Sequence, residues 1–580
     1  MEENSNLLLV LWLVELLTLG YSYIYLVVTY GDLKPQGSLY DFAVTIYSYD
    51  RPRLLNRLLL DILEQEQLLV IRKRRLFLQI VDDNSIGCHD VHYWRSQKSE
   101  NVNDFYQVNS KEQLLGLPCT FPSRLFGVLE TLEGTLDWQI WISKRHFGKH
   151  EHWKMVRRAF ETLKDVHSTF YVFLQDDMRI CCQFFDRAQM FWSLIEDRYK
   201  MTLSLHCDNN RVNYSGWTML NSTQKHRAVV LSGWVESSNF LCESRFLEWM
   251  NYTFPMVNPS RWYRRKYASS GVGETLSNLL YRAGYSMYRT SHSLLYHCRA
   301  RDSKMHPVIR KEELLETFAF IDGDVVGSRM ELECVTVTCS MASTWPRTQL
   351  LYDSLYSLAP QIDIIYLYLN DYEHIPSFLH VDFVQIVSCP ESSDLGDIGK
   401  FYVTPHADYH FTLDDDIIYP WDFVMEMISC YTSLPQPALL GVHGVMLDQE
   451  KLFRQDYFQS RTVISLEMAV PCPCQVNILG TGAMLYQPRS FNIPKEIFIE
   501  KNMADIYIAI LAKSRNINLF IVNRSSYWLT EQRKDDIPSI YEDFIRNGQK
   551  RRKITKMLRE FMPWKCSHTD NLSVCCFTQS

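Results

Sequence analysis

Three consecutive carboxylates, Asp414 to Asp416, directly follow the apolar run YHFTL at 409–413. Such a run predicts a buried strand, and in open α/β sheets ligands bind beyond the carboxyl ends of the strands. Because side chains alternate along a strand, we expect Asp414 and Asp416 to project to the same side. Mg²⁺ and Mn²⁺ prefer such hard oxygen ligands and also bind diphosphate oxygens, so the triplet predicts a metal–diphosphate site. An acidic turn that caps the next helix is the alternative interpretation.

A related sequence, QDD at 175–177, follows the apolar run TFYVFL earlier in the chain. Here Gln175 stands in the place of Asp414, and Asp177 matches Asp416. One carboxylate is therefore missing, although the remaining acids still offer metal ligands. The sequence consequently indicates metal binding and activity more strongly for the later site.

A further pair of carboxylates opens two apolar helices at similar distances beyond these strand ends. Glu274 lies 97 residues after Asp177, and Asp505 lies 89 residues after Asp416. An acid in the first turn of a helix is favoured by the helix dipole, and this interpretation stays open for both residues.

Acidic and amide residues close two other apolar strands. Asp82 and Asp83 follow LFLQIV at 76–81, and Asn370 follows IIYLYL at 364–369. A carboxylate at such a strand end can accept hydrogen bonds from the uracil or the ribose of a nucleotide, and the amide is the corresponding group in the second half. The alternative for the two acids is an Asx turn within the sequence Asp-Asp-Asn-Ser.

Two short segments of the second half also offer contacts to a ligand. Gly480 and Gly482 enclose a tight GTG turn, whose backbone can approach a sugar or a phosphate group closely. Lys400, directly after a glycine, can contact a phosphate group. A plain turn and a solvated lysine are the alternatives.

The elements that position these residues follow one plan twice. Apolar runs with strand character alternate with helical runs, which predicts parallel, doubly wound α/β sheets. The elements of the first plan are expected at 41–48, 53–69, 76–81, 151–164 and 169–174. Those of the second are expected at 334–340, 348–358, 364–369, 381–387 and 409–413. This pattern indicates a duplicated domain rather than a solenoid, whose repeats would be only tens of residues long.

The bulk composition is that of a globular protein with more than one domain. Its 580 residues suggest two to four domains, and 46% hydrophobic residues exclude a disordered or fibrous chain. A net charge of −7 leaves no broad basic field for nucleic acid. The 16 cysteines lack the spacing of zinc fingers, so we expect free thiols.

The N-terminal segment Leu7–Val28 is apolar and, with 22 residues, long enough to cross a bilayer. Glu15 inside it costs about 2.5–3.5 kcal/mol at a membrane centre, so a buried or interfacial helix is the alternative. The expected localisation is membrane-associated through this single anchor, or otherwise cytoplasmic. A basic amphipathic tail ends the chain and is either a solvated helix or a contact with an anionic membrane surface. We divide the chain into this apolar segment, two domains and the tail, at 1–38, 39–325, 330–546 and 547–580.

Several motifs, taken in order, resemble the family 2 glycosyltransferases of GT-A fold. FAVTIYSYDRPRLLNRLLLDIL with LQIVDDNS resembles the opening of that family, and LDDDIIYP resembles its DxD metal motif. DLGDIGKFY, NILGTGAMLY and NMADIYIAILAK follow in the order of the family's acceptor-side segments. The resemblance covers roughly 40–545 and implies two tandem GT-A domains, which are Rossmann-like nucleotide-diphospho-sugar transferase domains. In architecture such a tandem resembles the bifunctional bacterial polysaccharide polymerases.

The resemblance implies a role for each candidate residue. The acid that acts as catalytic base in inverting members matches Asp505 and Glu274. Some members place a metal-binding histidine where this chain has His297, for which a structural role is the alternative. The implied ligands of Mn²⁺ or Mg²⁺ are Asp414, Asp416, Asp177 and His297. The implied contacts to the nucleotide sugar are Asp82, Asp83, Asp176, Asn370, Lys400, Asp415, Gly480 and Gly482.

The expected function is metal-dependent transfer, with inversion, of a hexosyl or N-acetylhexosaminyl group. The donor is a nucleotide diphosphate sugar, expected to be a UDP-sugar from the prevalence of that donor in the family, and the acceptor is a hydroxyl group, expected on a glycan. One alternative is a sugar nucleotidyltransferase, although SYDRP and STWPR lack the glycines of its phosphate loop. The other alternative makes the first half a non-catalytic module that binds a glycan or a partner.

Overall fold

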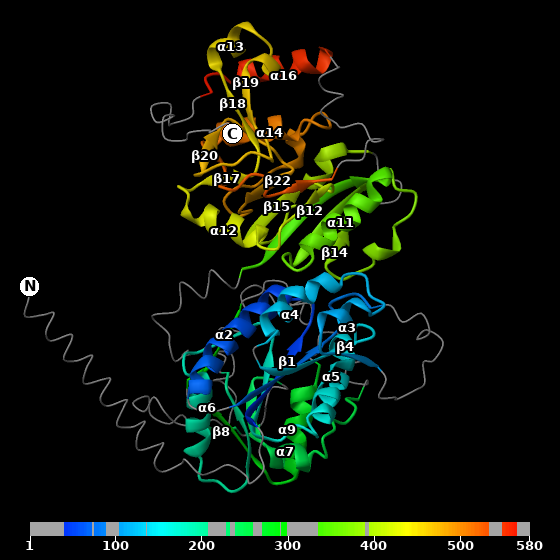
Figure 1. Cartoon of the computed structure of the whole chain (residues 1–580), viewed down its shortest axis with the longest axis vertical. Coiled ribbons are helices and arrows are strands. Elements are labelled where there is room, and N and C mark those ends of the chain that lie inside the picture. Colours follow the sequence, from blue (N-terminus) through cyan, green and yellow to red (C-terminus); the bar gives the residue numbers. More distant parts are fainter. Residues whose placement is uncertain are drawn as a thin grey trace, which may run out of the picture.

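The computed structural model of this chain contains two large mixed α/β sheets, one in each half of the sequence (Figure 1). The structure describes residues 40–71, 75–88, 104–134, 136–206, 228–231, 238–258, 270–290, 292–298, 335–388, 394–532 and 548–564. The apolar segment Leu7–Val28 and the junction between the two predicted domains lie outside the described residues. The domain limits therefore stay predictions.

The first half forms a nine-stranded sheet with the order β3-β4-β2-β1-β5-β9-β7-β10-β8. Its strands are β1 (Tyr40–Ser48), β2 (Leu76–Asp82), β3 (Phe105–Val108), β4 (Asp137–Ser143), β5 (Ser168–Gln175), β7 (Lys200–Ser204), β8 (Ala228–Leu231), β9 (Phe240–Glu243) and β10 (Ser286–Thr290). Its α-helices are α2 (Pro52–Ile71), α3 (Lys111–Leu115), α4 (Phe126–Leu132), α5 (Gly148–Thr162), α6 (Phe184–Ser193), α7 (Ser244–Trp249) and α9 (Val272–Arg282).

The second half forms an eight-stranded sheet with the order β14-β13-β12-β15-β22-β17-β23-β20. Its strands are β12 (Val337–Thr344), β13 (Ile364–Asn370), β14 (Val384–Ile386), β15 (Tyr409–Leu413), β17 (Ala438–Gly441), β20 (Cys474–Val476), β22 (Ala483–Tyr486) and β23 (Asn518–Ile521). Its α-helices are α11 (Thr348–Leu358), α12 (Phe423–Ser433), α13 (Gln449–Arg454), α14 (Ala504–Ser514) and α16 (Gly548–Glu560). Each half also has a short two-stranded pair, β6 (Met178–Ile180) with β11 (Leu295–His297) and β16 (Ile417–Ile418) with β24 (Thr530–Glu531).

The two large sheets repeat each other in strand order and direction. In the first, β4, β2, β1 and β5 are parallel neighbours, β9 runs antiparallel to β5 and β7, and β10 is parallel to β7. In the second, β14, β13, β12, β15, β22, β17 and β23 follow the same scheme. The predicted α/β class and repeated plan are confirmed. The prediction of wholly parallel sheets is wrong, because a reversed strand lies next to the acid-bearing strand of each half.

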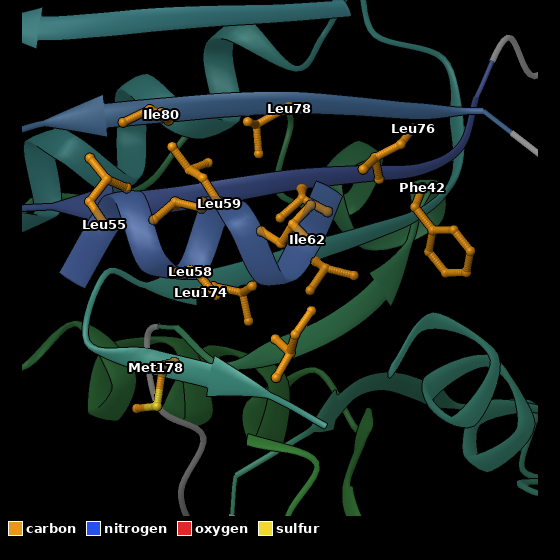
Figure 2. Close-up of a cluster of buried hydrophobic side chains, with 14 of the residues drawn as sticks. Phe42, Leu55, Leu58, Leu59, Ile62, Leu76, Leu78, Ile80, Leu174 and Met178 are labelled. Carbon is orange, nitrogen blue, oxygen red and sulfur yellow. The ribbon is translucent and has the colours of Figure 1, made fainter. Parts of the chain in front are cut away.

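Helix α2 shows how the apolar pattern of the sequence builds the first core. Leu55, Leu58, Leu59 and Ile62 recur at helical spacing, and all four are fully buried. Figure 2 shows them together with the side chains of β1 and β2, such as Leu78. Each buried leucine or isoleucine contributes about 1.5–3 kcal/mol to stability. This packing fixes α2 and, with it, the loop between β1 and α2.

The two halves meet where the segment before α4 contacts the end of α11 and the start of α2 contacts the segment after α11 (Figure 1). Arg124 is buried there and donates hydrogen bonds to the carbonyl of Ala359 at 2.7 Å and to the carboxylate of Asp50 at 2.6 Å. Arg53 donates to the carboxylate of Asp363 at 2.8 Å. A buried guanidinium is costly without such partners, so these contacts hold the loops of both halves together.

The helix of the predicted basic tail, α16, packs on the second half. Ile554 and Leu558 are buried in the same hydrophobic cluster as α14, and Arg551 pairs with Asp456. The apolar side of this helix is therefore covered by protein. Among the described helices, none combines the length and the apolar character needed to cross a membrane.

The described cysteines are free thiols with one exception. Cys88, Cys119, Cys181, Cys182, Cys242, Cys339, Cys430, Cys472 and Cys474 are free, as predicted. Cys298, directly after β11, is disulfide-bonded. The prediction of free thiols is therefore wrong at this position.

Candidate functional site

The three acids of the second half lie in a turn between β15 and β16. The guanidinium of Arg347 contacts Asp415 at 3.2 Å and also contacts Asp416. Asp414 pairs instead with the ammonium group of Lys400. Asp414 and Asp416 thus have different ionic partners, although Asp414 lies close enough to raise the pKa of Asp416. Their projection to one side stays a prediction, since the strand ends before the triplet.

Negative charge at this turn exceeds the positive charge around it. Burial and then the neighbouring Asp414 raise the pKa of Asp416 to about 7. Burial also raises the pKa of Asp415, although Arg347 opposes this shift. One buried carboxylate oxygen of Asp415, Oδ2, has no hydrogen-bond partner. A further cation at the turn would therefore be stabilised.

The GTG turn at 480–482 lies against this acidic turn, and its glycines allow the approach. A Cβ atom on Gly482 would lie 2.0 Å from Oδ2 of Asp414. A Cβ atom on Gly480 would lie 1.8 Å from Nε2 of His443. Any side chain at either position would therefore displace a polar group of the site. The glycines make room for protein side chains, and their predicted contact with a sugar or phosphate group stays untested.

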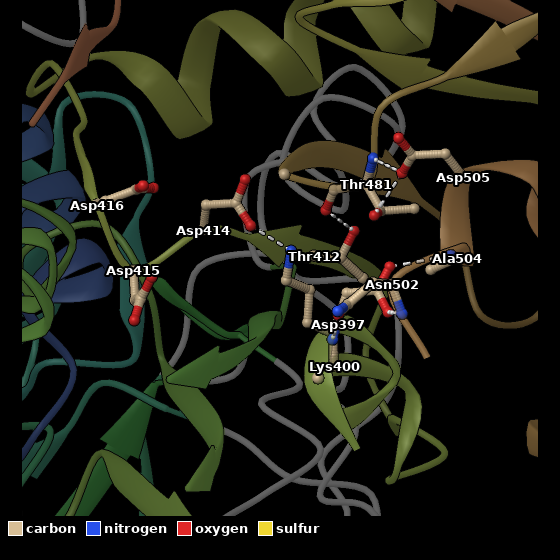
Figure 3. A network of polar contacts seen from close by, with 12 residues as sticks. Asp397, Lys400, Thr412, Asp414, Asp415, Asp416, Thr481, Asn502, Ala504 and Asp505 are labelled. Carbon is tan, nitrogen blue, oxygen red and sulfur yellow. Dashed lines mark hydrogen bonds and ion pairs between the residues drawn. The ribbon is translucent and has the colours of Figure 1, made fainter. Parts of the chain in front are cut away.

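Asp505 lies in the first turn of α14 and is oriented by the same GTG turn (Figure 3). Thr481 donates to Oδ1 of Asp505 from its backbone nitrogen at 2.8 Å and from its hydroxyl at 2.7 Å. Asp397 accepts hydrogen bonds from the backbone nitrogens of Asn502, at 2.5 Å, and Ala504, at 2.9 Å, and so holds the start of α14. Asp505 thus has one oxygen fixed by protein and a second oxygen that bonds to no described residue.

Two other predicted ligand contacts of the second half are buried in protein. The amide oxygen of Asn370 accepts hydrogen bonds from the backbone nitrogens of Leu395, at 2.8 Å, and Gly396, at 3.2 Å. Lys400 is only 4% exposed, and its ammonium group pairs with Asp414. Both residues thus shape the site, and their contacts with a nucleotide stay predictions.

The first half repeats the acid–arginine contact with its own residues. Arg51, from the loop after β1, contacts Asp176 at 2.8 Å and also contacts Asp177. Nε2 of His297 lies 3.4 Å from Oδ2 of Asp177, so two predicted metal ligands do lie together. Burial raises the pKa of Asp177, but Arg51 and His297 outweigh this effect and hold the pKa well below its usual range.

Asp82 and Asp83 hold loops of the first half. Asp82 accepts hydrogen bonds from the backbone nitrogen of Ser85, at 2.8 Å, and from its hydroxyl, which is the turn considered as the alternative. Burial raises the pKa of Asp82 to about 7. Asp83 accepts hydrogen bonds from the backbone nitrogens of Phe147, at 2.7 Å, and Gly148, at 2.9 Å, at the start of α5. A contact of either acid with uracil or ribose stays a prediction.

The two short strand pairs show which residues occupy corresponding positions in the two halves. In the β6–β11 pair, the residue after Asp177 lies opposite His297. In the β16–β24 pair, the residue after Asp416 lies opposite Glu531. Glu531 therefore has the position in the second half that His297 has in the first. The predicted bases also match in place, since Glu274 lies in the first turn of α9, where it is exposed, and Asp505 in that of α14.

Four residues at these sites were not found from the sequence, namely Arg51, Arg347, His443 and Glu531. A sequence pattern could have indicated the two arginines, because YDRP and WPR both follow the first strand of their half. His443 and Glu531 had no such signal, because strand pairing brings Glu531 beside the acids and loop packing brings His443 against the GTG turn.

No three His, Cys, Asp or Glu side chains within the described ranges lie close enough together to form a metal centre by themselves. Mg²⁺ in phosphate sites typically takes one or two carboxylates and completes its shell with phosphate oxygens and water. A metal at either acidic turn would therefore need further oxygen ligands from a bound molecule or from water.

No protein-family model matches the chain, and no curated protein matches it. Among solved structures, the chain is similar to the apo-form glycosyltransferase GlyE of Streptococcus pneumoniae TIGR4. The two are 10% identical, with a TM-score of 0.20, over 57% of this chain and 75% of that chain. A similarity of this size does not show a function for this chain.

Proposed function

We propose that the chain is a glycosyltransferase with an active site in its second half. The observation that carries the proposal is the GTG turn, which has the acidic strand end on one side and Asp505 on the other. Transfer from a nucleotide diphosphate sugar needs positive charge at the diphosphate and a separate base for the acceptor hydroxyl. The proposal includes the tandem GT-A fold, which the motif order and the repeated strand order support.

Asp505 acts as the base in this proposal. Its free oxygen takes the proton of the acceptor hydroxyl while the hydroxyl oxygen bonds to the anomeric carbon. The bond from the anomeric carbon to the diphosphate breaks at the same time, and the nucleoside diphosphate leaves with inversion at that carbon. The two hydrogen bonds from Thr481 keep Oδ1 engaged and so direct Oδ2 toward the acceptor.

The acidic turn holds Mn²⁺ or Mg²⁺ in this proposal, through Asp414 and Asp416. The donor set is made of carboxylate oxygens, and a buried oxygen of Asp415 lacks a hydrogen-bond partner, so the residues suit a hard divalent cation. When bound, the metal offsets the charge on the departing diphosphate. Arg347 and Lys400 contact the same acids and supply further positive charge beside the leaving group. A UDP-sugar as donor and a glycan as acceptor complete the proposal.

The experiment is a screen of nucleotide sugars for release of nucleoside diphosphate, with and without Mn²⁺. Asp416→Asn should abolish release, because it removes a charged ligand from the diphosphate site. Asp353→Asn, on the surface of α11 within the same half, is the matched control and should retain full activity. Unchanged turnover of Asp416→Asn at saturating Mn²⁺ would show that the acidic turn is not the donor site.

A second candidate concerns the first half, which we propose as a site that binds nucleotide or glycan with little turnover. The supporting observation is that Arg51 and His297 already neutralise Asp177. Titration calorimetry with UDP and Mn²⁺ tests it. Two sites in the parent protein, one lost in Asp177→Ala and the other in Asp416→Ala, support a pocket in each half. One site, lost only in Asp416→Ala, would reduce the first half to a positioning module.

A further inference from the structure

Two free cysteines of the first half face each other across a pair of extended segments. Cys88 follows the loop at the end of β2, and Cys119 follows α3. They are partners in an isolated antiparallel bridge, and their side chains share a hydrogen bond. The bridge is extended by a hydrogen bond from the backbone nitrogen of Thr120 to the carbonyl of Gly87, at 3.2 Å.

This geometry suits a disulfide. Opposed residues of an antiparallel pair have Cα atoms about 4.5–5.5 Å apart. Disulfides form across Cα separations of about 4.4–6.8 Å, so the bond needs no rearrangement of the backbone. The chain already contains an oxidised cysteine at Cys298, so disulfide formation is compatible with this fold.

We propose that Cys88 and Cys119 form a disulfide that fastens the loop after β2 to the surface of the first half that faces the second half. On one side, the backbone nitrogen of Cys88 donates to the side chain of Asn84, at 2.6 Å, directly after the acids that end β2. On the other side, the carbonyl of Thr120 accepts a hydrogen bond from the hydroxyl of Tyr352 in α11, at 3.1 Å. The next residue, Phe121, is fully buried in the hydrophobic core of the second half.

Thiol–disulfide exchange with a small disulfide such as oxidised glutathione supplies the chemistry. Cys119 is partly exposed and reacts first, whereas Cys88 is only 4% exposed. The hydrogen bond from Cys88 lowers the pKa of the Cys119 thiol, which favours the attacking thiolate. Cys119 attacks the oxidant and displaces one glutathione thiolate. Cys88 then attacks the sulfur of Cys119 and displaces the second glutathione thiolate. The two protein thiols thus lose two protons and two electrons to one molecule of oxidised glutathione, which leaves as two molecules of glutathione.

The sequence allows this bond to be mapped without ambiguity. Cleavage by trypsin places Cys88 in the peptide 76–95 and Cys119 in the peptide 112–124, and neither contains another cysteine. We expect the full chain, equilibrated with oxidised glutathione and then blocked with N-ethylmaleimide, to yield these two peptides as one disulfide-linked species. Reduction should separate them. The oxidised chain should also have a melting temperature about 5 °C higher, because the cross-link restricts the unfolded chain.

Single variants test the order of the two steps. Cys88→Ser should accumulate glutathione on Cys119, because the resolving thiol is gone. Cys119→Ser should leave Cys88 unmodified, because that thiol is buried. Cys242→Ser, which removes another buried free cysteine of the same half, should still give the linked peptides. Recovery of both peptides carrying N-ethylmaleimide, from a chain whose Cys298 is still disulfide-bonded, would overturn the proposal.

Discussion

The first half surrounds its strand-end acids with groups that neutralise them. Arg51 contacts both Asp176 and Asp177, and His297 lies 3.4 Å from the second of these acids. The pKa of Asp177 therefore lies well below its usual range, and its charge is stabilised by protein alone.

The second half keeps the arginine but has negative charge where the first half has neutral or positive side chains around its strand-end acids. Arg347 takes the place of Arg51, but Asp414 stands where the first half has glutamine, and Glu531 stands where it has histidine. Burial and neighbouring acids raise the pKa of Asp416 to about 7. One fold, repeated, thus gives one acidic turn in which Arg51 and His297 hold Asp177 ionised and another in which burial and neighbouring acids raise the pKa of Asp416. Equal folds do not imply equal sites, and the two halves differ in the electrostatics of a few side chains.

The largest effect that separates the halves should come from the two proposed bases. Asp505→Asn should lower kcat by about 10²–10⁴-fold, the usual contribution of general base catalysis, while the affinity for UDP stays unchanged. Glu274→Gln should leave the same reaction unaffected. The measurements are steady-state kinetics and titration calorimetry with UDP.

Two results would contradict this expected difference between Asp505 and Glu274. If the affinity of Asp505→Asn for UDP falls together with its rate, Asp505 belongs to the donor site and is not the base. If Glu274→Gln is as damaging as Asp505→Asn, both halves take part in the reaction.

An intermediate effect should follow from removing each arginine. Arg51→Gln and Arg347→Gln each leave two buried or half-buried acids without their cation, which should lower the free energy of unfolding by about 2 kcal/mol. UDP with Mn²⁺ should restore the stability of Arg347→Gln, because the added cation replaces the lost charge. The same ligands should not restore Arg51→Gln. Urea unfolding measures both, and equal rescue of the two variants would mean that both acidic turns bind metal.

The elements that carry the acids could be predicted because their apolar runs are long and continuous. The helix at 348–358 and the strand at 409–413 have the predicted limits. The reversed strands β9 and β22 could not be predicted, since each has four residues and its direction depends on pairing with distant strands. The prediction of wholly parallel sheets failed for this reason.

The charge partners of the acids could not be predicted from local sequence either. Arg347 lies 69 residues before Asp416 and reaches it because β12 and β15 are parallel neighbours. Glu531 reaches the same acid through the β16–β24 pair. The glycines of the GTG turn were recognised, but the side chains that require them come from loops elsewhere in the chain, such as His443 from the loop after β17. Sequence patterns thus located the acids, whereas tertiary pairing decided their electrostatics.

The smallest expected effect is a difference in how stability depends on pH. The pKa of Asp416 is raised to about 7 in the folded protein from an ordinary value near 3.8, so between these values the folded chain holds a proton that the unfolded chain has lost. Raising the pH through this window therefore lowers the free energy of unfolding. The pKa of Asp177 is shifted the opposite way, so its contribution is present above about pH 4 and is lost only as the pH falls below that value.

Thermal unfolding of Asp416→Asn and Asp177→Asn between pH 5 and pH 8 separates these contributions. Asp82 and Asp176 also have pKa values raised, to about 7 and about 6, so the test is the difference between each variant and the parent protein. Asp416→Asn should lose less stability than the parent as the pH rises, by a few degrees in Tm. Asp177→Asn should be less stable than the parent by a constant amount across the same range. If both variants keep the slope of the parent, Asp416 is already ionised at pH 5. The pKa of Asp416 would then not be raised in the folded protein, and the electrostatic contrast between the two acidic turns would not exist.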